Sequence, residues 1–154
     1  MRLWPKSVGD RIREAFAFLT EVHGYRLIAH SDGGMGGSLT YRSDALWIAV
    51  AWDRGDPWLE FSPARSPAGP FEWDLVDQLL RGVPHFDGPG VPVRTAPVPE
   101  LAAFLREHLA EIEARFRPPV LGTTLGRLAE LDGERQVLVR QWWDRFKRRP
   151  APPG

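Results

Sequence analysis

The sequence contains no cysteine, which excludes disulfides, thiol nucleophiles and cysteine-based metal sites. It also lacks any apolar run near the ~18 residues of a membrane-spanning helix. The opening residues, MRLWPK, hold no apolar stretch long enough for a signal peptide. We therefore expect a cytoplasmic protein with no membrane partner.

The chain carries no net charge, because 20 basic residues balance 20 acidic residues. This balance argues against a globally basic nucleic-acid-binding protein. Lysine is scarce, and the many arginines, with 15 prolines and 15 glycines, indicate GC-rich coding rather than an arginine-specific function. The last fifteen residues are an exception: they hold five basic residues and one acidic residue, Asp144, for a net charge of +4.

Motifs of catalysis and cofactor binding are missing. The sequence has no G-x-S-x-G nucleophile elbow, no H-E-x-x-H metal motif and no Gly-Lys-Ser/Thr of a phosphate-binding loop. Its glycine cluster, Gly33–Gly37, precedes the strand-like segment Ser38–Tyr41 rather than a helix. We interpret this cluster as a flexible turn. Because the motifs named above are missing, we expect the protein to bind no cofactor and no metal.

An N-terminal helix is predicted over Val8–His23. Ser7 and Asp10 resemble a capping box, with Asp10 in place of the usual Glu. Apolar residues then recur at helical spacing, and Gly24 supplies a stop.

Four extended segments with short connections follow: Tyr25–His30, Ser38–Arg42, Ala45–Trp52 and Trp58–Ser62. Short connections predict antiparallel neighbours, because a parallel pair needs a crossover of about a dozen residues. Both alternating faces of Leu46–Trp52 are apolar, which predicts a central strand that is at least partly covered on both faces. The segment Asp53–Pro57 is predicted to be a hairpin turn.

Three helices are expected after the strands. The first opens at Phe71 and runs to Arg81, and the second runs from Glu100 to the stop at Pro118-Pro119. Between these two helices, Val91–Thr95 is a candidate edge strand.

The last helix is expected to begin with a cap at Thr123 or Thr124 and to break at Asp132-Gly133 before it reaches Arg148. The whole order predicts an α+β fold: an antiparallel sheet of four strands, or five with the candidate edge strand, with an N-terminal helix and three C-terminal helices. Residues 1–149 should form one domain and residues 150–154 a disordered tail.

Two His-x-Asp pairs are the strongest candidates for an enzyme with a dispersed site. They are His30 with Asp32 at a strand end, and His85 with Asp87 in a loop. Such pairs are common by chance, so we favour structural or solvent-exposed roles for both. The carboxylates of Asp53 and Asp56 are likewise explained by turn geometry.

The seven tryptophans suggest a binding role, because they are too many for all to be interior. Exposed aromatic residues beside arginines are typical of protein-binding hot spots. We therefore predict a partner-binding surface on the hairpin and the adjoining sheet face, formed by Trp47, Asp53, Arg54, Asp56 and Trp58.

The basic C-terminal segment supports an alternative. Four of its residues are candidates for contacts with nucleic-acid phosphates: Arg145, Lys147, Arg148 and Arg149. The same residues are explained by the helix dipole, which favours cations in the last turn.

The block Tyr41–Asp56 resembles small bacterial proteins of the toxin-immunity type, through its hydrophobic pattern, its Ser-Asp turn and its Asp-Arg-Gly turn. The resemblance covers about residues 11–81 and carries over no functional residue. It implies a helix, an antiparallel sheet and further helices, and a toxin as the bound partner. From these observations we favour a non-catalytic protein-binding protein. The alternatives are a nucleic-acid-associated protein and an enzyme whose site residues are dispersed along the chain.

Overall fold

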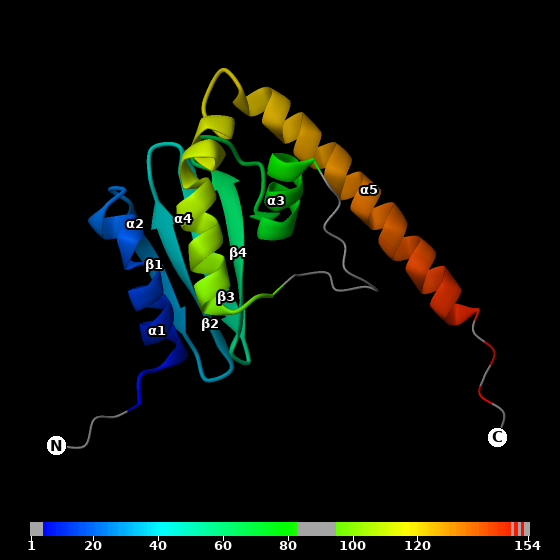
Figure 1. The fold of residues 1–154 in the computed structure, drawn as a ribbon, viewed down its shortest axis with the longest axis horizontal. Coiled ribbons are helices and arrows are strands. Elements are labelled where there is room, and N and C mark those ends of the chain that lie inside the picture. The colour runs from blue at the N-terminus through cyan, green and yellow to red at the C-terminus, as the bar shows by residue number, and fades with distance from the viewer. Residues whose placement is uncertain (1–4, 83–94, 149, 151, 153–154) are drawn as a thin grey trace.

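The computed structural model describes residues 5–82, 95–148, 150 and 152 of the chain. The elements follow in the order α1 (Val8–Ala15), α2 (Ala17–Glu21), β1 (Arg26–Asp32), β2 (Gly36–Arg42), β3 (Leu46–Asp53), β4 (Asp56–Pro63), β5 (Phe71–Glu72), α3 (Trp73–Arg81), α4 (Val98–Arg115) and α5 (Leu121–Lys147). This order confirms the predicted α+β class, with an N-terminal helical segment, an antiparallel sheet and three later helices (Figure 1).

The sheet has five strands in the order β1-β2-β3-β4-β5, and all described neighbours are antiparallel. β3 is therefore the middle strand, as its two apolar faces predicted. The hairpin turn is tighter than predicted, because Asp53 and Asp56 already pair and only Arg54 and Gly55 remain between the strands. Both turn residues have positive φ angles, 51° and 86°, which match the twist of a two-residue hairpin.

The fifth strand is Phe71–Glu72, which was predicted to open a helix. Phe71 pairs with Phe61, and Glu72 keeps an extended backbone (φ −67°, ψ 149°) as the N-cap of α3. Pairing with β4 thus delays the helix to Trp73. The candidate edge strand Val91–Thr95 lies outside the described residues except for Thr95, and so does most of the predicted tail 150–154.

The glycine cluster is only partly a turn, which corrects our prediction. β2 already begins at Gly36, and Gly37 pairs with Asp32 on one side and Trp52 on the other. A Cβ on Gly37 would lie 2.2 Å from the Ser31 carbonyl oxygen and 2.4 Å from the Trp52 ring. Strand pairing therefore extends into the cluster because glycine leaves space for that ring.

The N-terminal helix is divided at Phe16 rather than continuous. The predicted capping box is present: Ser7 Oγ accepts from the Asp10 backbone N–H at 3.1 Å, and Asp10 Oδ2 accepts from the Ser7 N–H at 3.3 Å. At Phe16 the backbone leaves helical geometry (φ −102°, ψ 9°), and both Phe16 and Leu19 are fully buried.

The helices cover one face of the sheet. Alternate residues of β3 are buried there, and they form one core with apolar residues of α1, α2, the junction between these two helices, and α4: Leu46, Ile48, Val50 and Trp52 with Ile12, Phe16, Leu19, Leu101, Leu105, Leu109 and Ile112. Figure 1 shows α4 crossing the sheet and α3 beside β4. Tyr25 Oη also donates to Glu113 Oε1 of α4 at 2.5 Å, and burial together with this bond raises the pKa of Tyr25.

The last helix is continuous from Leu121 to Lys147, so the predicted cap and break are both wrong. Thr124 lies inside the helix and donates its hydroxyl to the Arg115 carbonyl at 2.6 Å. Gly133 lies inside the helix, as a single helical glycine can, and two side-chain bonds span it: Arg135 and Gln136 both donate to Asp132 at 3.0 Å. The described helices include none with the length and hydrophobicity to span a membrane.

Candidate partner-binding surfaces

The second face of the sheet is formed by the residues that alternate with the core. We call it the open face: Ser38, Thr40 and Arg42 of β2, Trp47, Ala49, Ala51 and Asp53 of β3, and Asp56, Trp58, Glu60 and Ser62 of β4. These side chains are half-buried or exposed, in contrast to the fully buried residues between them. The core helices pack on the opposite face, so none of the helices in the described ranges covers the open face (Figure 1).

Four of the five predicted partner-binding residues share this face. Trp47 pairs with Ser62, Trp58 pairs with Ala51, and the Ala49–Glu60 pair lies between them. Asp53 and Asp56 pair with each other at the end nearest Trp58. The fifth residue, Arg54, is exposed in the turn itself. The structure thus brings the two tryptophans and the two aspartates together on one strip of surface.

The open face has a different charge at each end. Asp53 and Asp56 are both exposed at the hairpin end. At the other end, Arg26 pairs with Arg42, and Arg42 pairs with Trp47. The Arg42 guanidinium lies 5.2 Å from the centroid of the Trp47 ring, a cation–π contact that restrains both side chains.

The two tryptophans differ in how their indole nitrogens are satisfied. Trp58 Nε1 donates to Glu60 Oε1 at 3.1 Å. Trp47 Nε1 is buried and has no hydrogen-bond partner within the described ranges. Both rings are only half-buried, which leaves apolar area for a partner to cover.

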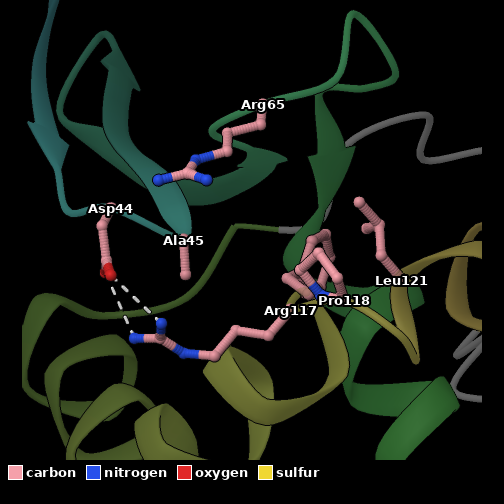
Figure 2. A pocket seen from close by; sticks show the side chains of 7 residues that line it. Asp44, Ala45, Arg65, Arg117, Pro118 and Leu121 are labelled. Atoms are coloured by element: carbon pink, nitrogen blue, oxygen red, sulfur yellow. Dashed lines mark hydrogen bonds and ion pairs between the residues drawn. The ribbon is translucent and has the colours of Figure 1, made fainter.

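A group of arginines surrounds the β2–β3 turn, at the basic end of the open face. Two adjoining hollows, of about 210 Å³ and 410 Å³, share Asp44 and Arg65. We call them together the arginine hollow, which is lined by Gly24, Arg26, Ile28, Arg42, Ser43, Asp44, Ala45, Arg65, Phe116, Arg117, Pro118 and Leu121. Figure 2 shows the smaller hollow, with Arg65 and Arg117 reaching toward Asp44 from different elements.

Asp44 is the single acidic residue that lines the arginine hollow, and Arg117 donates a hydrogen bond to each of its carboxylate oxygens. Arg117 Nη1 donates to Asp44 Oδ2 at 3.1 Å and Nη2 donates to Oδ1 at 3.2 Å (Figure 2). These bonds and the guanidinium charge lower the pKa of Asp44 and raise the pKa of Arg117. Arg26, Arg42 and Arg65 form no ion pair with any residue that the structure describes.

The sequence did not point to the arginine hollow. Arg26 lies in β1, Arg42 in β2, Arg65 after β4 and Arg117 between α4 and α5. Because the four come from separate segments, no spacing along the chain marks them as a group. Their common signal is an excess of arginine over lysine, which GC-rich coding explains equally well.

The C-terminal half of α5 exposes apolar side chains. Val137, Leu138, Trp143 and Phe146 are between 42% and 53% exposed. The rings of Trp142, Trp143 and Phe146 pack on each other, with centroids 4.9 to 5.9 Å apart. Figure 1 shows this part of the helix leading away from the sheet.

The predicted nucleic-acid-binding residues lie on the same projecting segment. Arg145, Lys147 and Arg148 are all exposed there, and Arg149 lies outside the described residues. The helix dipole accounts for cations in this last turn as well, so the placement is compatible with either interpretation.

The structure gives no support for a catalytic site at either His-x-Asp pair. His30 and Asp32 are both exposed in β1, and no described hydrogen bond joins them. His85 and Asp87 lie outside the described residues. In the part of the chain that is described, no group of three or more histidines or carboxylates is arranged to hold a metal ion.

Comparison of the chain with protein-family models, with curated proteins and with solved structures gives no match.

Proposed function

We propose that this protein is a non-catalytic binding protein that contacts another protein through its open face. One observation carries the proposal: Trp47 and Trp58 lie on the sheet face opposite the helices, with Asp53 and Asp56 beside them. Tryptophan side chains supply large contact areas, and such residues dominate the energetics of protein interfaces. Ala49 and Ala51, the next two β3 residues on this face after Trp47, are small and add little bulk beside the two rings.

The charges of the open face define the kind of partner. Asp53 and Asp56 favour a basic group at the hairpin end, whereas Arg26 and Arg42 favour an acidic group at the other end. Such an arrangement fixes the orientation in which a partner docks. The resemblance of Tyr41–Asp56 to toxin-immunity proteins motivates a finer proposal, that the partner is a toxin and this protein its cytoplasmic inhibitor.

The experiment is affinity capture with the full chain from cells of its own host, followed by titration of the purified partner. The wild type is compared with Trp58→Ala and with Asp53→Asn/Asp56→Asn. Asp53 and Asp56 are exposed, whereas Trp58 is half-buried and packs against the core, so thermal unfolding checks that Trp58→Ala still folds. Val22→Ser is the matched control, because Val22 is 72% exposed and lies outside the open face.

We expect the wild type and the control to hold the partner equally. Trp58→Ala should cost about 2 kcal/mol or more of binding free energy, roughly a 30-fold rise in Kd. A partner that binds the open-face variants as tightly as the wild type would contradict the proposal. So would the absence of any partner for the wild type.

A second candidate function is association with nucleic acid through the projecting half of α5. It is favoured by the exposure of Arg145, Lys147 and Arg148 on a segment that leads away from the sheet. Binding of DNA or RNA would then weaken steeply as salt is raised, because phosphate contacts release counterions. Titration at low salt with no binding would remove this candidate.

A further inference from the structure

The residues that line the arginine hollow carry an excess of positive charge. Four guanidiniums line it, and Asp44 is the one carboxylate among them. Arg117 already donates to both oxygens of Asp44, so this carboxylate is engaged. Like charges at close range raise each other's energy unless an anion lies between them. The hollow therefore favours an anionic ligand.

The number of available donors indicates the type of anion. A single carboxylate is matched by one arginine, as the bidentate contact between Arg117 and Asp44 shows. Arg26, Arg42 and Arg65 offer three further guanidinium groups to one hollow. A phosphate group carries more charge and has three terminal oxygens, each of which accepts hydrogen bonds. Planar guanidinium groups match phosphate geometry particularly well.

The larger hollow has enough space for a small ligand, and one of the side chains that line it, Arg42, is already restrained. Its volume of about 410 Å³ is in the range of small-molecule sites. Gly24, with φ of 71°, lines it, and a Cβ there would meet no atom within 4 Å. Stacking on Trp47 restrains the Arg42 guanidinium before any ligand arrives, which reduces the entropy lost on binding.

We propose that the arginine hollow is a binding site for a small phosphate-bearing anion. Arg42 and Arg65 contact the phosphate oxygens, Arg26 contributes further positive charge, and Arg117 holds Asp44 away from the ligand. Arg42 also belongs to the open face, but the site differs from the protein-binding role because its ligand is a small anion and no second protein is required.

The test is calorimetric titration of the full chain with pyrophosphate and with inorganic phosphate, at an ionic strength held constant with sodium chloride. Succinate, a dicarboxylate, is titrated in parallel. The variant Arg42→Gln/Arg65→Gln removes two unpaired cations from the hollow. The matched control, Arg11→Gln/Arg140→Gln, removes two exposed arginines of α1 and α5 that lie outside the hollow, so it has the same net charge as the hollow variant.

We expect pyrophosphate to bind the wild type and the control with equal Kd, and to bind at least tenfold more weakly to the hollow variant. Succinate should bind the wild type at least tenfold more weakly than pyrophosphate does.

The proposal is overturned if succinate binds equally well, which would indicate a site for carboxylates such as those of an acidic protein. It is also overturned if wild type and hollow variant bind pyrophosphate equally, or if none binds. Thermal unfolding in chloride alone checks that each variant folds. The open-face variants Trp58→Ala and Asp53→Asn/Asp56→Asn leave all four arginines in place and should bind pyrophosphate as the wild type does, so the two proposals fail separately.

Discussion

Gly37 shows at the scale of one residue how local composition can mislead. In the sequence it belongs to a run of glycines that is typical of a flexible turn. In the structure it lies in β2, directly between Asp32 and Trp52, where the buried Trp52 ring crosses it. Gly34, two residues before β2, has open space around its Cβ position. The two glycines therefore serve different purposes although their local sequences are similar.

Substitution of these glycines tests that difference. Gly37→Ala should lower the free energy of unfolding by about 1–3 kcal/mol, because the new methyl group overlaps the Ser31 carbonyl and the Trp52 ring. Gly34→Ala should leave stability unchanged or raise it by about 0.5 kcal/mol, since it restricts the unfolded chain without a clash. Urea unfolding of both variants measures the effect. Equal stabilities would mean that β2 does not begin inside the glycine cluster.

At the scale of the element, α5 has two halves with different roles. Its first half contributes Leu128 and Leu131 to the core, where both are almost completely buried. Its second half contributes no residue to that core within the described structure. An isolated helical segment of this length is marginally stable in water. Its helicity therefore depends on the attached first half and on contacts among its own aromatic rings.

Removal of residues 137–154 should accordingly leave the free energy of unfolding within about 1 kcal/mol of the wild-type value. Leu131→Ala, which creates a cavity in the first half of the same helix, should cost about 2–5 kcal/mol. Urea unfolding compares the two variants. The shortened chain should also bind less of a hydrophobic dye, because it loses the exposed side chains of Trp143 and Phe146. A loss of stability as large as that of Leu131→Ala would show that the second half packs on the rest of the protein.

At the scale of the whole molecule, Arg135 attaches α5 to the sheet and to α3. Its Nη1 donates to Glu72 Oε2 at 2.7 Å and to Asp74 Oδ2 at 3.3 Å, and its Nη2 donates to Asp132 Oδ1. Burial raises the pKa of Glu72, the charges of Asp74 and Glu60 raise it further, and Arg135 opposes this shift. Ionised Glu72 therefore disfavours folding at neutral pH, and Arg135 limits this cost.

Replacement of Arg135 should thus have a pH-dependent effect. Arg135→Gln should lower stability by about 2 kcal/mol at pH 7, because three carboxylates lose their shared cation. The pKa of Glu72 in the folded state lies above its ordinary value of 4.5 and should rise further in the variant. Proton uptake by Glu72 then favours the folded state as pH falls through that raised pKa toward 4.5. The stability lost by the variant should therefore be smaller at pH 5 than at pH 7.

Urea unfolding of the wild type and Arg135→Gln at both pH values measures this difference. Arg127→Gln is the matched control, since Arg127 pairs with Glu130 on the exposed side of the same helix. It should cost less than about 0.5 kcal/mol at either pH. If Arg135→Gln costs the same at pH 5 and pH 7, Glu72 is not linked to the attachment of α5.

Much of the fold was accessible from short-range patterns in the chain. The two-residue alternation of Leu46–Trp52 identified the middle strand, and the capping box at Ser7 placed the first helix. These features depend on residues close together in sequence, so composition and spacing reveal them. The continuity of α5 through Gly133 was not predictable in this way, because Asp-Gly is typical of a helix stop and also occurs inside helices, so the local pattern does not distinguish the two.

The candidate binding residues also fall into two groups, those that local sequence patterns identify and those that only the folded structure brings together. Trp47, Trp58 and the hairpin aspartates could be grouped from the strand period and the turn alone. Which face of β3 the helices leave open, and which arginines meet beside Asp44, were decided only when distant segments packed together. The physical reason is that alternation and turn geometry are properties of a few neighbouring residues, whereas the cover of a sheet face and the lining of a hollow depend on contacts between segments far apart in the chain.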